Sequence, residues 1–390
     1  MEKIAREGKA LFFIPISPSF MRRDGKIEPS WMPFFYNPYS VLNRDLTVLA
    51  IRAYRRKEGR IRTFVEPLSG ICVRSIRVLL EASEEETMAY ASDINPLAIE
   101  QCRRNAELNH LRTRMFAERN DARLFLLSLD SNGVPVDSID IDPYGSPIYY
   151  FESALKAIGK KGIVSVTATD LGALTGRYKD VALRRYGSNL TRTQFSREVG
   201  TRVLIGSFVR TSSYLDRAAH PLFSFYHEHF LKVLFLVRRE RNGATRAMEK
   251  LGYLCINEEG GISSIINLND FGTDECKKAI GPLWIDNIWN EEFTEQMKNE
   301  LKDSQYLSSE LKRTLSLIEK EIKVNSIGYY RIDEVCSAMR KNIPPFSVLI
   351  NELEKMGYRA SRTHFDKRGI RTNAPLEDLK RAIEEASSRL

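Results

Sequence analysis

Acidic residues recur in this chain at the ends of apolar, β-branched runs. Glu66, Asp93, Asp121 and Asp142 each follow such a run. A single acid in that place is usually a helix cap or a solvated turn residue. Four in succession, each behind a predicted strand, instead indicate a ligand site, because the carboxyl ends of parallel strands meet at one edge of a sheet.

The positions of these acids suit a nucleoside cofactor. Asp93 follows the second predicted strand, where an acid can accept hydrogen bonds from both ribose hydroxyls. Asp121 is placed to accept one from an adenine amino group. The turn after the first strand, LSGICV at 68–73, has a single glycine, whereas a pyrophosphate needs the close backbone approach that several glycines allow. The turn therefore argues against NAD and favours a smaller cofactor tail, such as the methionine of S-adenosylmethionine.

The segment DIDPYGSP, residues 140–147, places an acid, a proline and an aromatic ring at the end of a predicted strand. The proline ends the strand. A carboxylate there can accept a hydrogen bond from an exocyclic amine on a base, realign its lone pair and take up its proton. An aromatic neighbour can hold a base that has left its stack. Asp142 and Tyr144 supply both groups; a strand-terminating turn with a solvated acid is the alternative.

Strands and helices must alternate to bring these acids to one edge, and the sequence pattern does alternate. β-Branched runs predict strands, and apolar residues at helical spacing predict the helices between them. Asn95 as a cap, followed by Pro96, marks one helix start. The expected strands are 62–68, 88–92, 115–118, 138–141 and 163–169, and the expected helices are 45–57, 74–80, 96–109, 122–129, 148–158 and 197–213.

Two further strands, 222–226 and 230–237, follow each other so closely that we expect an antiparallel pair at the sheet edge. A parallel sheet covered by helices on both faces, with such a pair at one edge, is an α/β, Rossmann-like fold of the methyltransferase type. A generic doubly wound sheet is the alternative.

The composition and the hydrophobic pattern of the sequence change near residue 255. The stretch 260–285 is rich in glycine and predicts a linker or a small irregular module. The chain of 390 residues is long enough for two domains, so we predict a catalytic domain at 1–265 and a smaller α+β domain at 266–390. The elements expected beyond the linker are a long helical region at 288–324, helices at 332–340, 346–356 and 376–390, and a strand at 358–365.

The composition indicates a globular protein with a basic bias. Lys and Arg exceed Asp and Glu by 8, which favours a polyanionic partner such as nucleic acid. Neither a membrane helix nor a signal peptide is indicated, so we expect a cytoplasmic protein. The five cysteines are scattered without a CxxC, which predicts neither a disulfide framework nor a complete zinc site. Nothing in the sequence marks an obligate protein partner.

Ten stretches, in order, carry a family resemblance over nearly the whole chain. They are REGKA (6–10), FFYNPYSVLNRDL (34–46), LSGICVRSIR (68–77), SDINPLAIE (92–100), NDA (120–122), DIDPYGSP (140–147), TATDLGALTG (167–176), RYG (185–187), GPLWI (281–285) and RTHF…GIRTNAP (362–375). No single stretch would suffice, but their combination resembles the tRNA guanine-26 N2-dimethyltransferase family. The resemblance implies transfer of one or two methyl groups from S-adenosylmethionine to the exocyclic N2 amine of guanosine 26 in tRNA.

The resemblance also implies roles for single residues. Asp142 would be the catalytic carboxylate that handles the amine protons, and Phe35 and Tyr144 would sandwich the target base. The residues expected to bind the cofactor are Arg44 and Arg74, which would contact it directly, Asp93 at its ribose, and Asp121 and Ala122 beside its adenine.

Two departures from the family pattern affect these expectations. The first turn of the family usually reads like SATGIR, whereas here the glycine has moved and Cys72 takes its place, so the backbone contacts to the cofactor are left open. Many members carry four zinc-binding cysteines before GPLW, but here that region holds only Cys255 and Cys276. We therefore expect no zinc and two isolated thiols.

Basic residues crowd one stretch of the predicted second domain, with His364 and Phe365 among them. Cations interleaved with rings are typical of nucleic-acid binding, so we expect this stretch to grip tRNA; a solvated basic face is the alternative. The cations are Arg359, Arg362, Lys367, Arg368 and Arg371, and Arg184, Arg185 and Arg192 are expected to add phosphate contacts. Two other functions remain open: methylation of an adenine N6 amine, and tRNA binding without catalysis.

Overall fold

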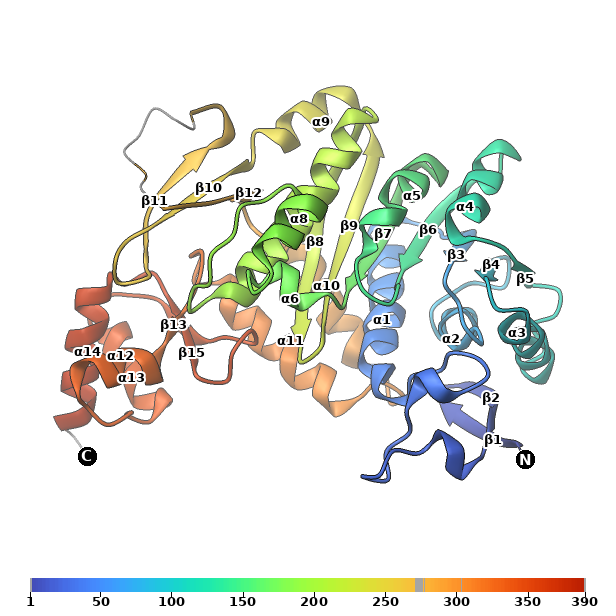
Figure 1. Ribbon diagram of the computed structural model, residues 1–390, viewed down its shortest axis with the longest axis horizontal. Helices are drawn as coiled ribbons and strands as arrows, with labels where there is room; N and C mark the ends of the chain where they lie inside the picture. Colours follow the sequence, from blue (N-terminus) through green and yellow to red (C-terminus); the bar gives the residue numbers. More distant parts are fainter. Residues whose placement is uncertain (1, 271–275, 277, 303, 389–390) are drawn as a thin grey trace.

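The structure is a computed structural model that describes residues 2–270, 276, 278–302 and 304–388. Its centre is a seven-stranded sheet (Figure 1). Five neighbouring strands are parallel, and β9 runs antiparallel to both of its neighbours. In spatial order the strands are β5 (Met115–Arg119), β4 (Met88–Asp93), β3 (Thr63–Glu66), β6 (Val136–Ile141), β7 (Ile158–Ala168), β9 (Phe230–Arg239) and β8 (Arg217–His227).

This strand order confirms the predicted Rossmann-like methyltransferase fold. The first strand in the chain, β3, lies inside the sheet, and the order reverses beside it, between β3 and β6. The carboxyl ends of the parallel strands therefore share one edge, with a switch point at which such folds bind ligands. The antiparallel pair expected near the sheet edge is β9 with β8.

Helices cover both faces of the sheet, as the alternating pattern requires. On one face α1 packs against α2 and α10, and α2 packs against α3; on the other face α4 packs against α5, and α5 against α8 (Figure 1). The helix α8 is buried along most of its length, which explains why it has apolar residues on nearly every side. The helix bounds are α1 (Val41–Glu58), α2 (Val73–Glu81), α3 (Pro96–Leu108), α4 (Ala122–Ser131), α5 (Phe151–Ala157), α8 (Ser196–Tyr214) and α10 (Glu291–Lys302).

The N-terminus forms a hairpin, β1 (Glu2–Glu7) with β2 (Ala10–Pro15), that lies against α2 and α3. The REGKA stretch makes its turn. Gly8 has a φ of +59°, and a Cβ there would lie 2.1 Å from a carboxylate oxygen of Glu81, so only glycine fits this turn. The hairpin thereby brings the Glu7 carboxylate to the ends of α1 and α2.

The glycine-rich stretch that was expected to be a linker or a small irregular module contains strands. β10 (Leu251–Ile256) pairs antiparallel with β11 (Ile262–Asn267) and with β12 (Ala279–Trp284). Short strands broken by glycines escape a pattern search, because they pair only once α8 packs against β12. Cys255 and Cys276 are joined by a disulfide, so the expectation of two isolated thiols was wrong.

The C-terminal part carries a small core of its own. It is built on β15 (Gly369–Thr372), which pairs with β13 (Tyr330–Arg331) and β14 (Ala360–Arg362). Three helices pack around it: α12 (Ile332–Met339), α13 (Phe346–Lys355) and α14 (Leu376–Ser388). The helical region expected at 288–324 is two helices, α10 and α11 (Ser309–Ile322), whose apolar faces belong to the main core. The expected final helix ends within the described residues at Ser388; residues 389–390 lie outside them. The division at residue 265 stays a prediction.

Candidate active site

A cavity of about 310 Å³ opens at the carboxyl edge of the sheet, beside the switch point. Three segments that are far apart in the sequence form its walls: residues 35–44, the turn 68–74 after β3, and the loop 142–144 after β6. The tip of the β8–β9 hairpin closes the fourth side with His229 and Phe230. Phe35, Arg44, Arg74, Asp142 and Tyr144, all predicted from the sequence, line this cavity.

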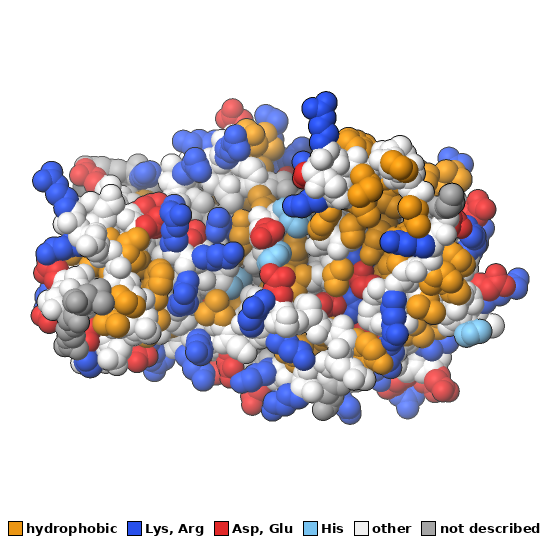
Figure 2. Space-filling view, turned by 90° about the horizontal axis from the view of Figure 1, so that it is seen from below, with side chains coloured by type: hydrophobic (Ala, Val, Ile, Leu, Met, Phe, Trp, Pro, Cys, Tyr) orange, Lys and Arg blue, Asp and Glu red, His pale blue; other side chains and the backbone are white. Residues whose placement is uncertain are grey.

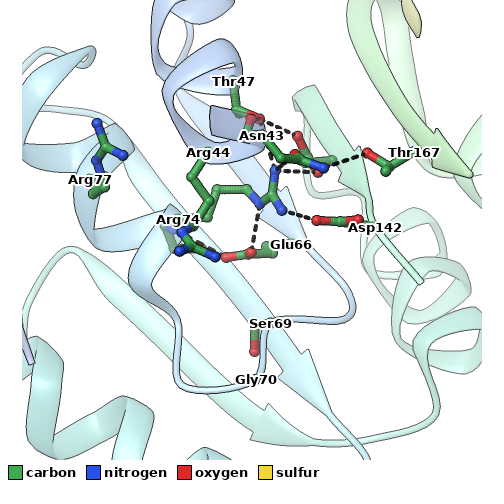
Figure 3. Close-up of polar contacts among 12 residues, drawn as sticks. Asn43, Arg44, Thr47, Glu66, Ser69, Gly70, Arg74, Arg77, Asp142 and Thr167 are labelled. Carbon is green, nitrogen blue, oxygen red and sulfur yellow. Dashed lines mark hydrogen bonds and ion pairs between the residues drawn. The ribbon is translucent and has the colours of Figure 1, made fainter. Parts of the chain in front are cut away.

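Arg74 is the centre of the polar network at the floor of the cavity (Figure 3). The side chain is buried, and each guanidinium nitrogen has a partner. Nε donates to Glu66 Oε1 at 3.0 Å, Nη1 donates to Asn43 Oδ1 at 2.9 Å, and Nη2 is paired with the Asp142 carboxylate. An arginine held in this way has a fixed direction, and its outer nitrogen faces Asp142.

A third carboxylate and a second cation lie beneath Arg74. Asp140, fully buried in β6, lies 3.1 Å from Arg74 Nη1 through Oδ1. Its other oxygen accepts hydrogen bonds from Lys232 Nζ at 2.9 Å and from the Thr47 hydroxyl at 2.8 Å. Lys232, fully buried in β9, also donates to Asn43 Oδ1 at 2.9 Å. Five charged groups thus meet in one buried cluster, which we call the site cluster: Glu66, Arg74, Asp140, Asp142 and Lys232.

Burial and neighbouring charges shift the pKa values in the site cluster in different directions. Burial raises the pKa of Glu66 to about 7, against the opposing charge of Arg74. Burial alone would also raise the pKa of Asp140, but Arg74 and Lys232 hold it below its usual value. Burial lowers the pKa of Lys232 although Asp140 opposes this. Titratable groups with such perturbed values are typical of functional sites.

The DPYG loop is held in place from the strand next to it. Gly145, with a φ of +93°, donates its N–H to the Thr169 hydroxyl at 2.7 Å and accepts from the Thr169 N–H at 3.0 Å. Ser146 bonds to the Tyr186 hydroxyl, which donates to Asp170 at 2.8 Å. The TATD and RYG stretches therefore anchor the loop that presents Asp142. The Asp142 side chain is 20% exposed and faces the cavity.

Phe35 and Tyr144 lie together at the mouth of the cavity. Their ring centroids are 5.7 Å apart and the ring planes are at 85°, an edge-to-face contact. Tyr144 is 81% exposed and Phe35 is 43% exposed. Two rings in mutual contact leave no room for a base between them, so a sandwich requires one ring to turn. The high exposure of Tyr144 leaves its side chain free to do so.

The turn after β3 comes close to residues 35–37. Gly70 has a φ of +51°, and a Cβ there would lie 2.5 Å from the Phe35 carbonyl oxygen. The displaced glycine is thus required at its new position. Cys72 begins α2 with a positive φ and is joined by a disulfide to Cys102 in α3. The prediction of no disulfide framework was wrong, because spacing in the sequence does not show that α2 and α3 lie side by side.

Asp93, Asp121 and Ala122 lie farther along the same edge, outside the lining of the cavity. The strand order places them after β4 and β5. Asp93 accepts the Gly70 N–H at 2.9 Å and so ties its strand end to the turn. Asp121 caps α4 through the N–H groups of Arg123 and Leu124. The acids predicted at successive strand ends therefore follow one another in space: Asp121, Asp93, Glu66 and Asp142.

Arg44 reaches the cavity from α1, but its charge is already paired. Nε and Nη2 donate to the two oxygens of Glu7, at 2.7 and 2.6 Å. Glu7 also accepts from Arg77 at 2.9 Å. The REGKA hairpin thus fixes Arg44 in a bidentate ion pair.

Four polar residues of the site were missed by sequence reasoning: Asn43, Thr47, Asp140 and Lys232. The sequence does mark Lys232, because it is the one charged residue in the run FLKVLFLV, in which all the remaining residues are apolar. A lysine inside a buried strand needs a buried partner. Asp140, two residues before Asp142, is the matching acid. His229, which lines the cavity, carried no comparable signal.

Comparison with known proteins agrees with this geometry. The sequence model of the N2,N2-dimethylguanosine tRNA methyltransferase family matches residues 20–384. Similar curated proteins include the tRNA (guanine(26)-N(2))-dimethyltransferases of Sulfolobus acidocaldarius and Sulfurisphaera tokodaii. The first is 36% identical (98% of this chain, 97% of the relative) and the second 34% identical (97% of this chain, 98% of the relative).

A relative from Aquifex aeolicus is described as a tRNA (guanine(26)-N(2)/guanine(27)-N(2))-dimethyltransferase and is 33% identical, covering 98% of this chain and 96% of the relative. Among solved structures, Trm1 from Pyrococcus horikoshii in complex with S-adenosyl-L-methionine superimposes with a TM-score of 0.84. It is 26% identical and covers 98% of this chain and 99% of its own. The chain belongs to the N2,N2-dimethylguanosine tRNA methyltransferase family.

Proposed function

We propose that this protein transfers methyl groups from S-adenosylmethionine to the exocyclic N2 amine of guanosine 26 in tRNA. Family membership and the likeness to a structure with that cofactor support the reaction. The observation that carries it in this chain is the placement of Asp142. Its carboxylate lies at a cavity mouth, beside two exposed rings, on a loop that two hydrogen bonds to Thr169 hold in place. A tRNA substrate is consistent with a cytoplasmic protein.

The residues along the sheet edge fit the cofactor. Asp93 follows β4, where an acid can accept the ribose hydroxyls, and Asp121 and Ala122 follow β5, where they can flank the adenine. Arg74 and Arg44 line the other end of the cavity. Protein carboxylates already hold both guanidinium groups, so they supply positive charge near the methionine carboxylate. The cofactor supplies an electrophilic methyl group on a sulfonium.

Asp142 and the two rings then act on the base. The target guanine leaves its stack and is held between Phe35 and Tyr144, once one ring has turned. Asp142 accepts a hydrogen bond from the N2 amine, which aligns the nitrogen lone pair with the methyl carbon. As the N–C bond forms, the C–S bond breaks, its electron pair stays on sulfur, and the amine proton passes to Asp142. A second turnover on the same nitrogen gives the dimethylated base. Much of the catalysis is positioning.

A basic groove of about 740 Å³ can hold the tRNA backbone. It lies between the β8–β9 hairpin, α11 and the β14–β15 segment, next to the cavity. Figure 2 shows histidines with acidic side chains beside them in a hollow, and Lys and Arg side chains around it. Its predicted cations are Arg362, Lys367 and Arg368, all exposed, and Arg197 and Arg331 join them. Such a cluster suits phosphate contacts.

The structure corrects three residues of the expected basic stretch. Arg371 is 1% exposed and pairs with Glu198 and Glu321, so it cannot reach a phosphate. The side chain of His364 is buried against Glu321, and Phe365 is buried beside it, so neither can stack on a base. Arg359, Arg184 and Arg192 are exposed, whereas Arg185 is half-buried and paired with Asp170. Phosphate contacts by the exposed three remain a prediction.

The experiment is methyl transfer from labelled S-adenosylmethionine to an unmodified tRNA transcript and to the same transcript with A at position 26. We expect label on the first alone, recovered as N2-methylated guanosine after digestion. The Asp142→Asn protein should lose about 10²–10⁴ in rate and still bind the cofactor. Asp130→Asn, an exposed acid at the end of α4, is the matched control. Label on adenosine would favour the N6 alternative, and cofactor binding without transfer would contradict the proposal.

A further inference from the structure

The burial of Lys232 calls for an explanation that folding does not give. Its ammonium lies at 0% exposure in the interior of the sheet and is balanced by Asp140, also at 0%. Removing two charges from water is unfavourable, and an apolar pair of similar volume would often serve stability as well or better. Buried ionic groups that do not improve stability are candidates for a functional role.

Arg74 is shared among three carboxylates. Glu66 binds its Nε, Asp140 lies beside Nη1, and Asp142 is paired with Nη2. Asp142 is the most exposed of these carboxylates, at 20%, whereas Glu66 lines the cavity at 5% exposure and Asp140 is fully buried. The direction of the guanidinium therefore depends on how strongly the buried acids attract it.

Lys232 changes this balance through Asp140. It donates to one Asp140 oxygen while Arg74 approaches the other, so it offsets the charge of the acid that would otherwise draw Arg74 into the sheet. Besides Asp140, Lys232 has two neutral partners: Asn43 Oδ1 from α1 at 2.9 Å and Thr167 Oγ1 from β7 at 3.3 Å. The charged groups facing it are Asp140 and Asp142 from β6 and its loop and Arg74 from α2.

We propose that Lys232 is a positioning residue for methyl transfer: by neutralising Asp140 it leaves the outer nitrogen of Arg74 to Asp142 and the cavity. It touches neither the base nor the reacting atoms. The inference rests on the proposed role of Asp142, and it assigns the Lys232–Asp140 pair the task of setting the charge around that carboxylate.

Opposite single substitutions should move the reaction in opposite directions. Lys232→Met leaves one more uncompensated negative charge near Asp142, so the carboxylate takes up a proton more readily. The apparent pKa of the acid-side limb of the kcat–pH profile should increase by about one unit, the size expected from one nearby charge. Asp140→Asn leaves an additional positive charge and should decrease this apparent pKa by a similar amount. In the double variant the apparent pKa should return to its original value.

The experiment compares four proteins: the parent, Lys232→Met, Asp140→Asn and the double variant. For each, kcat is measured against pH with saturating tRNA and cofactor, together with cofactor affinity and thermal unfolding. Because burial raises the pKa of Glu66 to about 7, all four proteins carry Glu66→Gln, so that the titration of Glu66 does not contribute to the profile. A structural role alone would lower unfolding temperatures without moving the limb. The proposal is overturned by limbs that coincide, or by a double variant that shifts as far as Lys232→Met.

Two controls keep the outcome decisive. If Lys232→Met does not fold, Asp140→Asn and the double variant still differ in the predicted direction, and equal limbs for these two would contradict the proposal. Asp142→Asn tests the underlying mechanism separately. If it keeps full activity, the proposed role of Asp142 fails, whatever the Lys232 variants show.

Discussion

This protein has two buried charge clusters that are built from similar groups but differ in their balance of acidic and basic side chains. The site cluster at the sheet edge sets three carboxylates against two cations, Arg74 and Lys232. A second cluster, which we call the junction cluster, joins α8, α11 and β15 through Glu198, Arg202, Glu321 and Arg371. There two carboxylates meet two arginines, and His364 adds a hydrogen bond to Glu321 at 2.6 Å. The junction cluster is balanced, whereas the site cluster carries an excess acid.

The pKa values of the buried glutamates in the two clusters differ in the direction expected from this charge balance. Burial alone would raise the pKa of Glu198, but Arg371 and Arg202 hold it at about 2. Burial raises the pKa of Glu66 to about 7 in spite of Arg74. A balanced cluster keeps its charges and ties elements together, while an unbalanced one keeps a proton available near neutrality. Both clusters are buried, so burial alone does not identify a functional site; the balance of charge and the access to a cavity do.

The largest effect on stability is expected from Arg371→Met. The variant leaves Glu198 and Glu321 buried with too few cations, and breaking a buried pair in this way costs about 3–5 kcal/mol. It also removes a guanidinium that lies 5.3 Å from the Trp289 ring centroid. The free energy of unfolding is measured by denaturant titration, with Arg371→Lys as the control that keeps the charge. A loss below about 1 kcal/mol would show that the junction cluster does not hold these elements together.

A smaller effect, with a defined sign, is expected from Glu66→Gln. Its folded pKa of about 7 lies above the ordinary value of 4.5 for a glutamate, so the native state binds the proton more tightly. The stability from this proton is present below pH 4.5 and is lost as the pH rises through 7. Glutamine mimics the protonated form, so the variant should gain on the wild type by about 3 kcal/mol between these limits. Unfolding is measured at intervals from pH 4.5 to 8.

Glu198→Gln should show the opposite sign and so sharpens the comparison. The folded pKa of about 2 lies below the ordinary value of 4.5 for a glutamate, so the carboxylate contributes stability above pH 4.5 that is lost as the pH falls through 2. The variant should be less stable than the wild type by about 3 kcal/mol at neutral pH, and the gap should close in acid. If both glutamines changed stability with the same pH dependence, the distinction between the clusters would not hold.

The acids at the strand ends could be predicted because each depends on local pattern: a β-branched run and the residue that ends it. The structure places Asp121, Asp93, Glu66 and Asp142 in order along one edge, as that reasoning required. The partners of these acids could not be predicted, since Lys232 and Asp140 are 92 positions apart. Their contact exists only after β9 has joined the sheet.

The same limit explains the errors outside the site. Arg371 was taken for a phosphate contact because a cluster of cations in sequence does not show which of them is buried. Cys72 and Cys102 are separated by 30 positions and meet only when α2 packs against α3. β10 and β12 are short and each contains a glycine, and β11 contains two successive serines, so periodicity does not mark them as strands. The packing of β12 against α8 is likewise not visible in the sequence.

The smallest effect on stability is expected from an exposed ion pair of the basic groove. Arg368 is 65% exposed and lies 2.8 Å from Asp333, and pairs of this kind contribute about 0–1 kcal/mol. Arg368→Ala should therefore leave the free energy of unfolding nearly unchanged, while tRNA affinity falls and the slope of log affinity against log salt concentration becomes shallower by about one unit.

The control is Arg60→Ala, which removes a 68% exposed arginine near the amino edge of β3. It should change neither the affinity nor the slope. If Arg368→Ala destabilised the fold as much as Arg371→Met, burial would not explain why ion pairs of the junction cluster contribute more to stability than exposed pairs. If the two alanine variants bound tRNA equally well, the groove would not be the surface that meets the phosphates.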